Sequence, residues 1–184
     1  PRVGSSMQIK DVSANRLGGL FFYLSKVDGK LQSDMRFDNY PRATLSGRMF
    51  IQSGYLTNFD FFKWMGNIFN LPELEKVYFD NIDTDFLTTF EKQGLDKINL
   101  VSDDLNLNGY FGLDKNEIVS SKISIIFSRR LMEKSANLQT LLNLVDEKSD
   151  RLAFDFQLSG NFHKMNFQWL ESEFKKKIQK AIPD

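Results

Sequence analysis

The only histidine of the chain, His163, is the first residue whose type could support acid–base or nucleophilic chemistry. A Ser-His-Asp triad requires a histidine that is oriented by a carboxylate and contacts a serine. His163 instead lies in a short polar segment, where a lone histidine is most often a surface residue. The sequence also contains no nucleophile elbow, phosphate-binding loop or dinucleotide fingerprint. We therefore predict no catalytic residue and a protein that is not an enzyme.

Two groups of carboxylates could bind a cation or transfer protons. The first comprises Asp80, Asp83 and Asp85, and the second comprises Asp103 and Asp104. The first group lacks the glycine and the terminal glutamate of an EF-hand loop. Because the chain has no cysteine, thiolate zinc sites, iron–sulfur clusters and disulfides are excluded. We interpret the carboxylates as solvated residues of turns and strand faces, and we predict no metal site and no cofactor.

The composition indicates a neutral protein with many aromatic side chains. Lys and Arg number 24, as do Asp and Glu, so no excess of positive charge attracts nucleic acid. The 18 phenylalanines supply large apolar side chains for a core or a groove. No apolar stretch reaches the roughly 18 residues that a membrane-spanning helix needs. Residues 1–6 look like a cloning scar, and we predict a single domain over residues 7–184.

Alternation of apolar and polar residues predicts most of the secondary structure, because alternate side chains of a strand point to one face. The segments predicted as strands are 18–24, 31–37, 43–51, 77–90, 98–100, 105–113, 123–127 and 152–158. Asp28-Gly29 is a typical hairpin turn, and Gln93-Gly94 indicates another turn.

Helical spacing of apolar residues predicts three further elements. Residues 58–69 form a short, very apolar helix that Asn58 could cap, and residues 131–145 form an amphipathic helix. A third helix is predicted from Trp169 onward. Its apolar positions are Leu170, Phe174 and Ile178, and its polar positions carry Lys175, Lys176, Lys177 and Lys180.

These elements predict a mainly β fold with a few helices, of the α+β class. The short connections favour antiparallel pairing over parallel crossovers. We expect a long, curved antiparallel sheet or open groove, packed with two or three short amphipathic helices.

The strands carry more apolar faces than two or three short helices could easily cover. An uncovered apolar face binds lipid, a protein partner or another copy of the chain. The residues that could line such a groove are Leu105, Leu107, Phe111, Leu113, Ile123, Ile125, Phe127, Phe154, Phe156 and Leu158. The sequence leaves open which of them line a groove and which pack beneath the helices.

From Gly47 onward the chain resembles the C-terminal region of the AsmA-like family, the relatives of AsmA and TamB in Gram-negative bacteria. The similarity covers about two thirds of the chain. The stretches that carry it are GRMFIQSGYLTN at 47–58, VYFDNIDTDF at 77–86, LNLNGYFGL at 105–113 and LSGNF at 158–162. The family often has a glycine-threonine pair and a proline near the last stretch, and this chain has neither there.

The resemblance implies a periplasmic module of a protein that is anchored in the inner membrane. Such proteins carry long sheets curled into an apolar groove, and they are implicated in phospholipid transport toward the outer membrane and in its homeostasis. The implied partner is phospholipid or another acyl lipid, and envelope proteins are further possible partners.

Two hypotheses therefore remain. In the first, the domain shields lipid in an apolar groove. In the second, it is a structural or assembly module with a closed core that binds a protein partner through a sheet edge. The lysines at 175–180 also allow contact between the C-terminal helix and a membrane surface.

Overall fold

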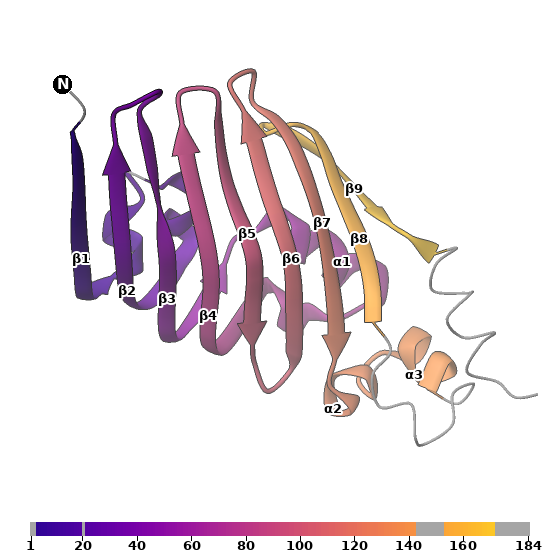
Figure 1. The fold of residues 1–184 in the computed structure, drawn as a ribbon. Coiled ribbons are helices and arrows are strands. Elements are labelled where there is room, and N and C mark those ends of the chain that lie inside the picture. The colour runs from indigo at the N-terminus through magenta and orange to yellow at the C-terminus, as the bar shows by residue number, and fades with distance from the viewer. Residues whose placement is uncertain (1–2, 20, 143–152, 172–184) are drawn as a thin grey trace, which may run out of the picture.

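The computed structural model describes residues 3–19, 21–142 and 153–171 and contains one antiparallel sheet of nine strands. The strands follow one another in chain order, so that each pairs with its neighbours in sequence (Figure 1). Their bounds are β1 Gly4–Ser13, β2 Val27–Asp38, β3 Thr44–Thr57, β4 Lys76–Thr89, β5 Lys92–Val101, β6 Leu105–Asp114, β7 Ile118–Phe127, β8 Ala153–Asn161 and β9 Lys164–Trp169. The prediction of a mainly β, antiparallel fold is confirmed.

The connections between strands differ at the two ends of the sheet. At the upper end in Figure 1, short turns join β2 to β3, β4 to β5, β6 to β7 and β8 to β9. We call these four turns, at residues 39–43, 90–91, 115–117 and 162–163, the rim. At the lower end, three of the four connections are long and contain helices. The sheet therefore has one bare end and one end that supplies covering segments.

The covering segments fold back over one face of the sheet. They contain the 3-10 helices η1 Ala14–Leu17, η2 Phe22–Lys26 and η3 Pro72–Glu75, and the α-helices α1 Asp60–Phe69, α2 Arg129–Met132 and α3 Ala136–Leu142. In Figure 1 the segments that contain η1, η2 and α1 lie behind the strands, away from the rim. We call the face they cover the apolar face and the opposite face the outer face.

Helix α1 is amphipathic, and its apolar side faces the sheet. Phe61, Phe62, Met65 and Phe69 are spaced three or four residues apart or adjacent, and all four are buried. The helix ends where Asn70 adopts a left-handed conformation, with φ of 53°, which asparagine tolerates better than most residues. The predicted helix over residues 58–69 is confirmed for residues 60–69; Phe59, and not Asn58, is the residue at its N-cap, where no side chain makes a capping bond.

The core lies between α1, the other covering segments and the apolar face. One row of apolar side chains, each in register with the next, runs from β2 to β8, and none of them is more than 8% exposed. The row consists of Leu31, Ile51, Ile82, Leu100, Leu107, Ile125 and Phe154. Strict alternation in the sequence produces this row, because alternate residues share a face.

The predicted strand at 18–24 and the hairpin turn after it are wrong. Residues 22–26 form η2, whose segment buries Phe21 and Leu24, three residues apart, against the sheet. Asp28-Gly29 lies inside β2 at a bulge, with Gly29 at φ of 144°. A β-carbon on Gly29 would come within 2.8 Å of Ile51, so close packing and the positive φ of the bulge, and not a chain reversal, require the glycine.

Three other boundaries differ from the predictions. Gln93-Gly94 lies within β5, and the turn comes earlier, at 90–91. The predicted helix over 131–145 is two short helices, α2 and α3, within the described residues. Its end, and the predicted C-terminal helix after residue 171, lie outside the described residues. Trp169 belongs to β9 instead of that helix.

Two strands were not predicted. The first is β1, in which Gly4, Ser5 and Ser6 of the presumed cloning scar pair with residues of β2. The second is β9, where Met165, Phe167 and Trp169 alternate.

Candidate functional site

All ten residues that were predicted to line a groove lie on the apolar face, on β6, β7 and β8. Eight of them are at most 8% exposed and belong to the core, namely Leu105, Leu107, Ile123, Ile125, Phe127, Phe154, Phe156 and Leu158. The other two, Phe111 and Leu113, are half-buried at the edge of the core nearest the rim. The structure thus brings the ten residues together but divides them into a covered group and a partly open pair.

The eight covered residues include an aromatic cluster with α1. The Phe69 ring makes edge-to-face contacts with three rings of the sheet. Its centroid lies 5.7 Å from that of Phe127, 5.5 Å from that of Phe154 and 5.4 Å from that of Trp169. About two turns earlier on α1, the ring centroid of Phe61 lies 5.4 Å from that of Phe156. Edge-to-face aromatic pairs contribute roughly 0.5–1.5 kcal/mol beyond the area they bury. This part of the apolar face is therefore closed by protein side chains.

Polar contacts hold α1 in place from the lower end. The buried hydroxyl of Ser135 donates a hydrogen bond to the Phe69 carbonyl oxygen at the end of α1 and accepts one from the Leu138 amide. Nearby, Lys134 Nζ lies 2.8 Å from Glu73 Oε1 of η3, and this contact lowers the pKa of the Glu73 carboxyl. Both contacts tie α1 and η3 to the turn between α2 and α3.

The segment between β1 and β2 covers the other side of the face. Phe21 is 2% exposed, and its ring lies 5.2 Å from Phe86 on β4. Burial raises the pKa of the neighbouring Tyr23 phenol well above its ordinary value. This segment therefore excludes water from the centre of the sheet.

Near the rim the apolar face stays partly open. Met7 on β1 is 55% exposed, and Phe37 on β2 is 38% exposed. Half-buried apolar side chains continue along the same side, on β3, β5, β6 and β9. Together they form what we call the open strip: Val3, Met7, Phe37, Leu45, Leu95, Phe111, Leu113 and Met165.

Register places these residues in two rows beside the rim. Phe37 pairs with Leu45 across β2 and β3, and Leu95 pairs with Phe111 across β5 and β6. Between them lie Met35 and Phe86, which are apolar and buried, and the uncharged Thr88 and Gln93. The two rows thus contain no charged side chain from β1 to β6.

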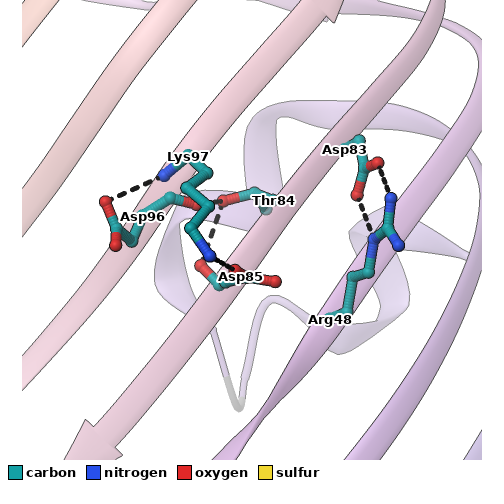
Figure 2. A network of polar contacts seen from close by, with 6 residues as sticks. All are labelled: Arg48, Asp83, Thr84, Asp85, Asp96 and Lys97. Atoms are coloured by element: carbon teal, nitrogen blue, oxygen red, sulfur yellow. Dashed lines mark hydrogen bonds and ion pairs between the residues drawn. The ribbon is translucent and has the colours of Figure 1, made fainter.

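The outer face has the opposite chemistry. Figure 2 shows Arg48 of β3 in a two-pronged contact with Asp83 of β4, with Nε 2.7 Å from Oδ1. The hydrogen bonds from this guanidinium lower the pKa of the Asp83 carboxyl. Lys97 Nζ lies 2.9 Å from Asp85 in the same view, and this bond raises the pKa of Lys97. A sheet face that carries such ion pairs is stable in contact with water.

The residues considered for acid–base chemistry do not form a site. His163 lies in a rim turn with its side chain 72% exposed, and its Nε2 is 3.4 Å from Glu117. Asp83 and Asp85 form ion pairs with different side chains of the outer face, Arg48 and Lys97. Asp80, Asp103 and Asp104 border an open hollow of about 530 Å³, in which Asp104 pairs with Arg130. In the described ranges, no group of three or more potential ligands could hold a metal ion.

Comparisons of the chain with protein-family models, curated proteins and solved structures found no match. No helix among the described residues is both long and apolar enough to cross a bilayer. The fold and the open strip therefore carry the functional argument.

The sequence analysis missed most of the open strip. Phe111 and Leu113 were predicted, but Met7, Phe37 and Leu95 were not. Their positions depend on which part of the face the covering segments leave bare, and periodicity along one strand does not contain that information.

Proposed function

We propose that the protein shields acyl lipid along the open strip, as a periplasmic module of an inner-membrane-anchored, AsmA-like protein in phospholipid transport and outer-membrane homeostasis. The observation that supports this most is the incomplete covering of the apolar face. Helices close the part of the face far from the rim, whereas apolar side chains on β1, β2, β3, β5, β6 and β9 remain partly exposed beside it. Exposed apolar area of this kind is a binding surface by default.

The chemistry of the strip suits an acyl chain. Each methylene moved from water to an apolar surface contributes about 0.8 kcal/mol. The two rows offer no charged group from β1 to β6, so a lipid tail meets no strong anchor and can slide along them. Lipid would contact Phe111 and Leu113 directly, whereas it could reach Ile125 or Phe154 only if α1 moved away.

The envelope setting rests on the resemblance to AsmA-like proteins. One residue of the stretch at 47–58 that carries this resemblance, Gly54, is needed for packing within the sheet. A β-carbon on Gly54 would lie 1.8 Å from the Asp28 carbonyl oxygen. The glycine therefore serves the sheet itself, whatever the sheet binds. This leaves lipid binding to be tested directly.

The test is native mass spectrometry with organic extraction of protein purified without detergent. We expect bound phospholipid in the wild-type chain and its loss in the double variant F111S/L113S. The matched control is Tyr110→Ser, which changes the adjacent residue on the outer face of the same strand and should keep the lipid. A clean apo mass for the wild type, repeated after incubation with phospholipid vesicles, would contradict the proposal.

The unpaired edge of β1 favours the second candidate, a module that binds a protein partner. Within the described residues β1 pairs only with β2, and seven of its first eight residues are exposed. Such an edge can accept a further strand. In that case the chain stays lipid-free, and an added partner protects the β1 amides from hydrogen exchange.

A further inference from the structure

The rim forms one connected edge. Arg42 of the first turn lies 2.9 Å from the Glu91 carboxylate of the second turn. The Glu91 carbonyl oxygen accepts a 2.8 Å hydrogen bond from the Lys115 amide of the third. The Glu117 carbonyl oxygen of the third accepts one, also of 2.8 Å, from the Phe162 amide of the fourth. These contacts hold four hairpin tips in a line, so that they act as one surface.

The tips present apolar side chains to the solvent. Phe90, at the tip between β4 and β5, is 92% exposed, and Tyr40, between β2 and β3, is 64% exposed. Ile118, at the start of β7, is 47% exposed. Six of the nine large exposed apolar residues in the described part of the chain lie on the rim or at the adjoining corner of the open strip: Val3, Met7, Phe37, Tyr40, Phe90 and Ile118. A phenylalanine so exposed on a tight turn contributes little to the core, and its ring is available for an outside contact.

We propose that the rim docks on the surface of a phospholipid bilayer, with Phe90 and Tyr40 inserted at the boundary between headgroups and acyl chains. Aromatic side chains prefer this boundary, where an apolar ring can be buried beside polar groups. Single rings that project from separate turns, with polar residues between them, fit a fluid planar surface. A folded protein partner would instead require a contiguous, complementary patch.

The rim has no net charge. Its four turns carry two cations, Arg42 and Lys115, and two acids, Glu91 and Glu117, so the charges sum to 2 − 2 = 0. A rim of this kind is neither attracted to nor repelled by a charged surface. Binding therefore depends on insertion of the rings and changes little with salt.

The rim also lies beside the end of the open strip. Phe37 and Leu45 are cross-strand partners, each one residue inside the strand end that flanks the first turn. A lipid that leaves the bilayer at the rim would meet the strip without crossing the polar outer face. This link to the strip rests on the proposed function, whereas docking of the rim does not.

The test is co-sedimentation of the whole chain with vesicles of phosphatidylcholine and phosphatidylglycerol. We expect the double variant Y40S/F90S to reduce the partition coefficient at least about tenfold, since burying even one such ring is worth more than the 1.4 kcal/mol of a tenfold change. The matched control is Y78S/Y110S, which removes two exposed aromatics of the outer face, 62% and 43% exposed. It should bind as the wild type does, and all variants should melt within about 2 °C of it, because none changes the core.

Equal binding by Y40S/F90S and the wild type would overturn the proposal, as would an equal loss in Y78S/Y110S. Loss of wild-type binding in moderate salt would also overturn it, because a charged segment and not the rim would then hold the vesicle. Native mass spectrometry separates this result from the proposed function. Y40S/F90S should still carry lipid once lipid has been supplied, whereas F111S/L113S should bind vesicles but carry none.

Discussion

The two halves of the apolar face belong to one sheet but differ in what lies over them. Far from the rim, Ile125 and Phe154 are fully buried beneath α1 and its neighbours. Close to the rim, Met7 and Phe37 remain exposed on the same face. The strands create part of the difference, because the covered row is wholly apolar, whereas the rows beside the rim also contain the polar Thr88 and Gln93. The rest arises from the connections, because the three long ones all leave from the lower end of the sheet.

This comparison separates residues that hold the fold from residues that are available to a ligand. A charge placed in the covered half must enter the core, whereas a charge placed in the open strip can reach water. Substitution of matched positions in the two halves is therefore the most direct way to test the comparison.

The largest effect is expected for Ile125→Asp. Ile125 is 0% exposed, and its in-register partners on the two flanking strands, Leu107 and Phe154, are also buried. An unpaired carboxylate there costs several kcal/mol, enough to abolish cooperative unfolding in a protein of ordinary stability. Phe111→Asp, in the open strip, should retain a cooperative urea transition at lower denaturant. If both variants unfold alike, the division of the face into covered and open halves is wrong.

A smaller effect is expected for Ser135→Ala, which tests how α1 is held over the covered half. The change removes the hydroxyl that bonds the Phe69 carbonyl oxygen and the Leu138 amide, both in a buried setting. Loss of such bonds costs about 1–3 kcal/mol. Urea unfolding should show this loss, and Thr140→Ala, an exposed hydroxyl on α3, should leave stability almost unchanged. A Ser135→Ala variant as stable as the wild type would mean that ring packing alone holds α1.

The sequence predicted the residues of the covered half better than it predicted their covering. Leu107, Ile125 and Phe154 alternate cleanly within their strands, and a strand fixes the face of each side chain once one is known. The fold class followed from the same pattern. The packing of Phe69 on Phe154 joins segments about 85 residues apart, and no local period specifies such a contact.

The wrong predictions have a common physical cause. The pair Asp28-Gly29 predicts a turn because glycine favours turns locally, yet here a neighbouring strand requires the small residue. Residues 18–24 predict a strand because a short apolar run is ambiguous, and tertiary packing folds residues 22–26 into η2. The rim was missed as a surface because Tyr40 and Phe90 become neighbours along one edge only after the sheet is formed.

The smallest effect is expected on the outer face, where Asp83 pairs with Arg48, whose side chain is 67% exposed to water. The pKa of Asp83 is lower in the folded protein than its ordinary value of 3.8, so the folded state favours the ionised form. The stabilising contribution is therefore complete above the unfolded value and is lost as the pH falls through the lower, folded value. Urea unfolding of the wild type and of Asp83→Asn should differ slightly at pH 7 and converge once the pH has fallen below the folded pKa of Asp83, and salt should reduce the difference at pH 7. A difference that persists in acid would mean that Asp83 stabilises the sheet through the packing of its side chain and not through its charge. The outer face would then depend on side-chain packing, as the covered half of the apolar face does.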